Sequence, residues 1–189
     1  MKKYLSTALT LFLICAFFAF LLSLVNKITL PQITRNQERA ILQGLKDVIS
    51  ENTSVNMSKG EVKVHKDGIN SYYIVLNNNA DKIGYVLNLQ GTGYGGALTL
   101  LAYYDISGKL VKSKLLDNSE TAGIGKKYEN DDNIAIFASY DEIPTIKSEL
   151  NASDVSVVSG ASISFQGIGE ALKKGKEYIE NTLNGGDAL

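Results

Sequence analysis

The sequence predicts an α+β fold, in which an antiparallel sheet with packed helices is preceded by one N-terminal transmembrane helix. Three observations support this prediction. The chain begins with a long uncharged apolar run, its middle alternates strand-like runs with short polar turns, and apolar residues near its end recur at helical spacing. The short turns indicate antiparallel neighbours, because parallel strands need a longer crossover connection. Strands followed by helices that pack on the same sheet are typical of the α+β class.

Composition excludes several classes of function. The 189 residues include 19 Lys and Arg against 20 Asp and Glu, and this balance lacks the basic surface of a nucleic-acid-binding protein. The single cysteine, Cys15, lies in the apolar run, so no intrachain disulfide can form. The single histidine, His65, lies in a strand-like segment. We therefore expect no nucleic-acid partner, no metal site and no Ser-His-Asp triad.

The apolar run covers residues 4–26 and contains no charged side chain. An α-helix needs about 20 apolar residues to cross the hydrocarbon core of a membrane, and this run supplies them. A cleaved signal peptide is the competing interpretation. Its apolar region would be shorter and would end in a small-residue cleavage site, which does not follow this run. We therefore expect an uncleaved single-span anchor over residues 4–26.

The charges beside the span indicate its orientation. Lys2 and Lys3 favour a cytoplasmic position for residues 1–3, because cytoplasmic flanks carry an excess of lysine and arginine. Three cations after the span weaken this bias: Lys27, Arg35 and Arg39. We place the main domain on the extracytoplasmic side of the cytoplasmic (inner) membrane.

Residues 27–50 are expected to form a linker helix that continues from the anchor, because their apolar residues keep helical spacing. Residues 51–189 are the expected extracytoplasmic domain, which starts with a loop over residues 52–58. Strand-like runs separated by polar turns then follow: residues 61–65, 71–76, 83–89, 97–104 and 110–116.

Two glycine-rich turns interrupt the strand pattern. Gly91–Gly96 joins two strands and, taken alone, is a hairpin loop, because no helix follows it as in a phosphate-binding fingerprint. Glu120–Lys127 follows a strand and offers a carboxylate, a hydroxyl, exposed backbone and two ammonium groups. Taken alone, this second turn is a solvated loop.

A third turn, Ser159–Ser164, consists mostly of small residues. It follows the β-branched run Val155–Val158, which we interpret as a short strand, and it leads into an amphipathic helix. Apolar residues at three- and four-residue steps indicate that helix: Phe165, Ile168, Leu172, Ile179 and Leu183. The unpaired N–H groups and the dipole of a helix start favour an anion such as phosphate. Alternatively, Ser162 or Ser164 only caps the helix, and the motif alone favours this simpler interpretation.

In this order along the chain, the segments resemble the FMN-binding domain family, in particular the G subunit of the Rnf electron-transport complex. The C subunit of the sodium-pumping NADH:quinone reductase is a longer relative. The resemblance covers nearly the whole chain and includes the N-terminal span and linker helix. Three motifs carry it: Gly-Tyr-Gly-Gly at 93–96, Glu-Thr-x-Gly-x-Gly at 120–125, and Ser-Gly-Ala-Ser at 159–162.

The resemblance implies FMN that is covalently attached by a separate flavin transferase, through a phosphoester, to the residue after Gly-Ala. That residue is Ser162 here, where the family usually has threonine. The family usually has proline, leucine and serine at the positions of Ala122, Ile124 and Phe165. The resemblance further implies cofactor contacts by residues of all three turns: Tyr94, Glu120, Thr121, Gly123, Ile124, Gly125, Ser159, Gly160, Ala161 and Ser164.

The function that the resemblance implies is electron relay by a membrane-anchored flavoprotein subunit of a ferredoxin:NAD oxidoreductase that moves Na⁺ or H⁺. The chain needs no catalytic acid or base for this role, and alone it would not catalyse a full reaction. Its expected partners are the other membrane and iron–sulfur subunits of the complex. Two alternatives remain open. One is a flavin-free membrane-tethered binding or scaffold domain, and the other is an FMN-domain electron carrier of another membrane reductase.

Overall fold

The computed structural model of this chain describes residues 2–49, 58–60, 68–77, 79–122 and 125–183. The chain divides into two compact units, Met1–Ala40 and Ile41–Leu189. The strand predicted over residues 61–65 lies outside the described residues.

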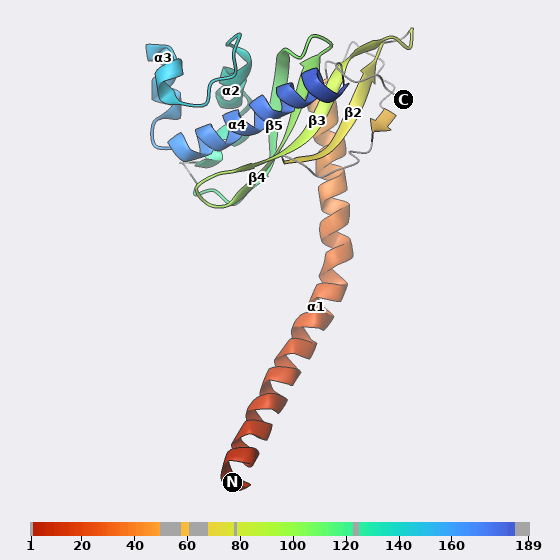
Figure 1. The fold of residues 1–189 in the computed structure, drawn as a ribbon, viewed down its shortest axis with the longest axis vertical. Helices are drawn as coiled ribbons and strands as arrows, with labels where there is room; N and C mark the ends of the chain where they lie inside the picture. Colours follow the sequence, from red (N-terminus) through yellow and green to blue (C-terminus); the bar gives the residue numbers. More distant parts are fainter. Residues whose placement is uncertain (1, 50–57, 61–67, 78, 123–124, 184–189) are drawn as a thin grey trace. The chain divides into compact units, whose positions relative to one another are not determined.

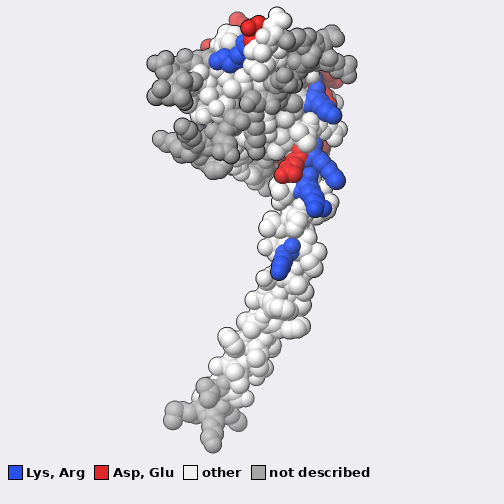
Figure 2. All heavy atoms as spheres, turned by 90° about the vertical axis from the view of Figure 1, so that its right-hand side faces the viewer, with Lys and Arg blue, Asp and Glu red and all other residues white. Residues whose placement is uncertain are grey.

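Helix α1 spans Lys2–Val48 and continues through Pro31, so the predicted anchor and linker helix are continuous. It is the one helix among the described residues that is long and apolar enough to cross a membrane. Large apolar side chains such as Phe12 and Phe18 are exposed along it. Figure 2 shows a long stretch of this helix without Lys, Arg, Asp or Glu. The predicted N-terminal apolar helix is therefore confirmed as a candidate membrane span.

The second unit contains a five-stranded sheet in which every neighbouring pair is antiparallel and the strands follow chain order (Figure 1). The predicted α+β class with an antiparallel sheet is thereby confirmed. The first strand begins at Ser58, the last residue of the predicted loop. The strands are β1 (Ser58–Gly60), β2 (Ile69–Leu76), β3 (Lys82–Thr92), β4 (Ala97–Asp105) and β5 (Leu110–Asn118).

Short helical segments connect β5 to the last helix: η1 (Gly125–Glu129), α2 (Asp131–Ile134), η2 (Ala135–Ala138), η3 (Lys147–Glu149) and α3 (Ala152–Val158). The short strand predicted at Val155–Val158 was therefore wrong, because these residues belong to α3. The carbonyl of Asn151 accepts hydrogen bonds from the N–H groups of Asp154 and Val155, which closes the first helical turn. The negative charge of Asp154 near the start of the helix also favours this conformation over the β propensity of valine.

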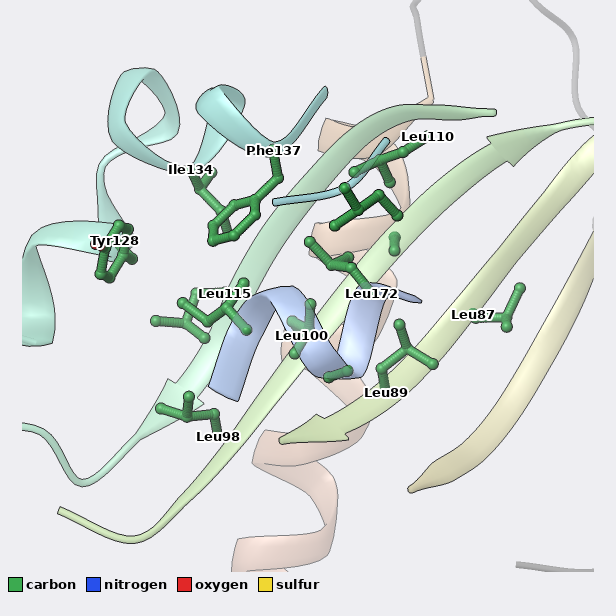
Figure 3. Packing of buried hydrophobic residues seen from close by; sticks show 14 of the residues in the cluster. Leu87, Leu89, Leu98, Leu100, Leu110, Leu115, Tyr128, Ile134, Phe137 and Leu172 are labelled. Carbon is green, nitrogen blue, oxygen red and sulfur yellow. The ribbon is translucent and has the colours of Figure 1, made fainter. Parts of the chain in front are cut away.

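Helix α4 (Ser162–Tyr178) covers one face of the sheet and continues into a π-helical turn, η4 (Ile179–Leu183). Its buried residues Phe165, Ile168 and Leu172 share one core with the side chains that β3, β4 and β5 direct to this face. Figure 3 shows Leu172 together with leucines of these strands. The labelled leucines of the strands are Leu87, Leu89, Leu98, Leu100, Leu110 and Leu115.

The opposite face of the sheet packs against the C-terminal turns of α1, within the second unit. Successive side chains of a strand point to opposite faces, so Val86 and Leu101 join a separate core with Leu45 and Val48. An ion pair between Asp47 and Lys114 of β5 lies beside this core. The sheet is therefore covered on both faces.

Helix α4 approaches the end of β3 so closely that both surfaces need glycine. A Cβ at Gly167 would clash with the carbonyl oxygen of Thr92, and a Cβ at Gly91 would lie 2.6 Å from the carbonyl oxygen of Gly167. Further along, the Tyr104 hydroxyl donates a hydrogen bond to the carbonyl of Leu172 at 2.7 Å. This close packing places the first turns of α4 beside the loop that follows β3.

We predict that Gly167→Ala lowers the free energy of unfolding by about 1–3 kcal/mol, because the added methyl group forces α4 away from β3. Urea denaturation of the full-length protein in detergent, followed by far-UV circular dichroism, measures this change. Gln166→Ala alters the exposed neighbouring residue and serves as the control, with an expected change within about 0.5 kcal/mol. Equal stability of the two variants would contradict the close packing.

Candidate functional site

The three turns singled out in the sequence meet around one cavity of about 460 Å³. Its volume falls within the range of about 300–1,000 Å³ that is typical of small-molecule sites. The lining residues come from the β3–β4 loop, the turn after β5 and the start of α4: Tyr94, Glu120, Thr121, Gly160, Ala161, Ser162, Ile163 and Ser164. Segments far apart in the sequence thus form one site.

Not every predicted site residue lines this cavity. Gly125 is buried against Glu120, and Ser159 lies just before the lining turn. Gly123 and Ile124 lie outside the described residues. Ile163, which the sequence did not single out, lines the cavity although half of its side chain is exposed. Its position between Ser162 and Ser164, within the third turn, is the sequence signal that could have identified it.

The start of α4 has no side-chain cap. Its N-cap residue is Ala161, with φ −127° and ψ 36°, and no side chain accepts a hydrogen bond from the first turn. The interpretation that Ser162 or Ser164 caps the helix was therefore wrong. Because the first N–H groups of a helix have no intrahelical acceptor, this end of α4 remains available to an anion in the cavity.

The three serines of this turn differ in their hydrogen bonding. The Ser159 hydroxyl donates to the carbonyl of Val155 at 3.0 Å, so it is engaged with the end of α3. The hydroxyls of Ser162 and Ser164 have no hydrogen-bond partner among the described residues, and both residues line the cavity. Ser164 is only 1% exposed as a residue, and its accessible part belongs to the cavity wall. A polar ligand in the cavity would supply these hydroxyls with a hydrogen-bond partner.

Gly160 gives the turn its shape through its backbone conformation. Its φ is +84°, in the left-handed region that favours glycine, while a Cβ there would meet no atom within 4 Å. The requirement for glycine is therefore conformational rather than steric. The turn reverses the chain between the end of α3 and the start of α4, as glycine does at many helix ends.

Glu120 links the other two turns. Its side chain is 5% exposed, and its Oε1 accepts a hydrogen bond from the N–H of Gly95 at 3.2 Å. A Cβ at Gly93 or at Gly125 would clash with the carboxylate. Because these two glycines have no side chain, the backbones of the loop after β3 and of the turn after β5 can both pack directly against the Glu120 carboxylate.

The turn after β5 continues into η1, where two neighbouring lysines have different surroundings. The Lys126 ammonium pairs with Glu129 at 3.6 Å on the exposed surface, where ion pairs contribute little to stability. The Lys127 Nζ instead donates a hydrogen bond to the carbonyl of Ser159 at 2.7 Å. Desolvation lowers the pKa of Lys127, and the nearby charge of Lys147 lowers it further.

An aromatic cluster supports the start of α4 from within the core. The rings of Phe137 and Phe165 stack with their centroids 4.8 Å apart, and Tyr128 packs against both. The Tyr128 hydroxyl is buried without a hydrogen-bond partner among the described residues, and burial raises the pKa of this phenol. Because Phe165 lies one turn after Ser162, the cluster fixes the helix start relative to η1 and η2.

We predict that Glu120→Ala lowers the free energy of unfolding by about 1.5–3 kcal/mol, because the variant loses a hydrogen bond to a charged group. Hydrogen exchange at the Gly95 amide should become faster at the same time. Urea denaturation and exchange mass spectrometry measure the two effects. The control is Glu177→Ala, which removes an exposed carboxylate from α4. Unchanged stability and unchanged exchange in Glu120→Ala would show that the carboxylate does not hold the loops.

Comparisons with known proteins bear on the identity of this site. The FMN-binding domain family matches residues 93–177, which include all three sequence motifs. The chain is 24% identical over 174 residues to the G subunit of a proton-translocating ferredoxin:NAD(+) oxidoreductase complex of Clostridium ljungdahlii, covering 91% of this chain and 89% of that protein. It is 25% identical over 183 residues to the G subunit of an ion-translocating oxidoreductase complex of Methanosarcina acetivorans, covering 94% and 95% of the two chains.

A third relative is the G subunit of an ion-translocating oxidoreductase complex of Cereibacter sphaeroides. It is 28% identical over 125 residues, which are 64% of this chain and 57% of that protein. The family match and the relatives agree with the resemblance found in the three sequence motifs. Residues 93–177 thus match the FMN-binding domain family, within a sequence similar over most of its length to G subunits of ion-translocating oxidoreductase complexes.

Proposed function

We propose that this chain is a membrane-anchored flavoprotein subunit of an ion-translocating ferredoxin:NAD oxidoreductase of the Rnf type, with FMN attached to Ser162. One observation carries the proposal. The uncapped start of α4 presents Ser162 and the buried hydroxyl of Ser164 to a cavity that residues of all three family motifs enclose. The names of the similar G subunits supply the class of complex.

The residues around the cavity fit a flavin mononucleotide. Its phosphate is an anion, which the free N–H groups and positive dipole of the α4 start would hold. The Ser164 hydroxyl would donate to a phosphate oxygen and so gain the partner that it lacks among the described residues. Tyr94 and Thr121 lie on the cavity wall formed by the other two turns and would border the isoalloxazine ring. Gly123, Ile124 and Gly125 remain predicted ring contacts.

Ser162 is the attachment residue that we propose. Its side chain is exposed, and its hydroxyl is not engaged by another described residue, unlike the hydroxyl of Ser159. In the attachment, the Ser162 Oγ bonds to the phosphorus of an activated flavin donor, loses its proton and displaces the leaving group. A separate flavin transferase would carry out this step. Serine is less hindered than the threonine that is usual in the family.

The bound FMN would supply the redox chemistry, and the protein would supply its position and surroundings. Glu120 would keep the two glycine turns closed around the ring, as its contacts with Gly93, Gly95 and Gly125 indicate. No acid or base of this chain is required for electron relay.

Ion movement belongs to other subunits in this proposal. The candidate membrane span of this chain has no charged residue between Tyr4 and Asn26, and ion pathways in membranes depend on polar or ionisable groups. The apolar helix would anchor the flavin domain, on the extracytoplasmic side, to the membrane subunits that move Na⁺ or H⁺. Iron–sulfur subunits of the same complex would exchange electrons with ferredoxin and NAD.

We predict that Ser162→Ala, produced together with the native flavin transferase, contains no covalent flavin, whereas Ser162→Thr keeps it. Intact-mass measurement and flavin absorption after denaturation report the attachment. Ser156→Ala, which changes an exposed serine of α3, is the control and should be modified like the natural chain. Covalent flavin in Ser162→Ala would exclude this residue as the attachment point.

We predict that Ser164→Ala slows flavin attachment about 10-fold or more, because a hydrogen bond to a charged group contributes about 1.5–3 kcal/mol. The same change should leave the stability of the flavin-free protein within about 0.5 kcal/mol of the natural value, because it breaks no hydrogen bond to another described residue. Time-resolved intact mass and urea denaturation measure these two effects. If Ser164→Ala were destabilised but received flavin at the normal rate, Ser164 would contribute to core packing and not to flavin attachment.

A further inference from the structure

Lys127 connects two of the three turns that surround the cavity. Its Nζ donates a hydrogen bond to the carbonyl of Ser159 at 2.7 Å, across 32 positions of the sequence. The same nitrogen lies 5.8 Å from the centroid of the Tyr128 ring. The neighbouring Lys126 makes no such connection, because its ammonium pairs with Glu129 within η1.

The acceptor of this bond lies immediately before the proposed attachment residue. Ser159 caps the C-terminus of α3, and only Gly160 and Ala161 separate it from Ser162. Glycine has the most backbone freedom of any residue type. The position of Ser162 beyond Gly160 therefore depends on how firmly the residues on either side of Gly160 are held. On the N-terminal side of Gly160, the described hydrogen bonds of Ser159 are those with α3 and the one with Lys127.

The end of α3 attracts the Lys127 ammonium, although burial and a neighbouring lysine act against its charged form. The carbonyl end of a helix carries partial negative charge, so the Lys127 ammonium stabilises the end of α3. The side chain is half-buried, and desolvation together with the charge of Lys147 lowers the pKa of Lys127.

We infer that Lys127 is a positioning residue: it ties the turn after β5 to Ser159 and thereby sets where Ser162 presents its hydroxyl for flavin attachment. This inference rests on the proposed function of Ser162. Lys127 itself need not touch the flavin. Its effect passes through the backbone of Ser159 and Gly160, and Lys126 should have no comparable effect.

The test compares three full-length variants in detergent, Lys127→Met, Lys127→Arg and Lys126→Met, with the natural chain. With transferase and flavin donor supplied, Lys127→Met should lower the maximal rate of attachment about 10-fold or more, because misplacement of a reacting group by about 1 Å is costly. The concentration of the acceptor protein that gives half the maximal rate should stay within about twofold of the value for the natural chain. Lys127→Arg should recover most of the rate because it keeps a cationic donor, and Lys126→Met should behave like the natural chain.

A second measurement does not depend on flavin. Hydrogen exchange of the unmodified proteins should be faster over residues 160–164 in Lys127→Met and unchanged in Lys126→Met. The positioning role would be overturned if flavin were attached to Lys127→Met at the rate of the natural chain. It would also be overturned if hydrogen exchange over residues 160–164 were equal in Lys127→Met and Lys126→Met. If the natural chain is never modified, the proposed attachment at Ser162 fails, and the exchange comparison still decides whether Lys127 holds the turn.

Discussion

The Glu120 carboxylate lies between two glycine turns, and the shape of the cavity depends on that placement. Burial of a carboxylate is costly unless hydrogen-bond donors surround it, and the N–H of Gly95 is one such donor. The absence of a side chain at Gly93 and at Gly125 lets the two turns reach the carboxylate from opposite sides. A side chain at either position would push the turns apart. One buried charge thus sets the distance between two walls of the site.

The third wall depends on the contact between α4 and β3. Gly91 and Gly167 let the helix backbone approach the strand directly, so the start of α4 lies beside the loops and not above the middle of the sheet. The helix start then faces the cavity without a side-chain cap from Ala161, and Ser162 and Ser164 line that cavity. The uncapped helix start lowers stability in the absence of a ligand, and the two hydrophobic cores that enclose the sheet offset this cost. Such unsatisfied groups are expected where a protein keeps a site ready for an anion.

The elements with regular apolar patterns could be predicted from the sequence. The strand-like run over residues 83–89, bounded by turns, predicted β3 within a few residues of its true ends, and the spacing of Phe165, Ile168 and Leu172 predicted α4. The β-branched run at Val155–Val158 suggested a strand, but the local hydrogen bonds from Asp154 and Val155 to the carbonyl of Asn151 close a helical turn despite the β propensity of valine. The meeting of the three turns was expected only from the family resemblance. The hydrogen bonds from Gly95 to Glu120 and from Lys127 to Ser159 join residues far apart in the sequence, so no local pattern encodes them. The choice of Ala161 as the N-cap residue, in place of a neighbouring serine, follows from the backbone conformation of the turn.

The measurement that most directly tests the assignment is a fragment-ion mass spectrum of the peptide that contains Ser162. The full-length chain should be purified from cells that assemble its native complex and supply the maturation enzyme. We predict a peptide that carries the mass of FMN less one water, with fragments that place the addition on Ser162. An unmodified peptide from a complex that is active in electron transfer would contradict covalent flavin at the start of α4.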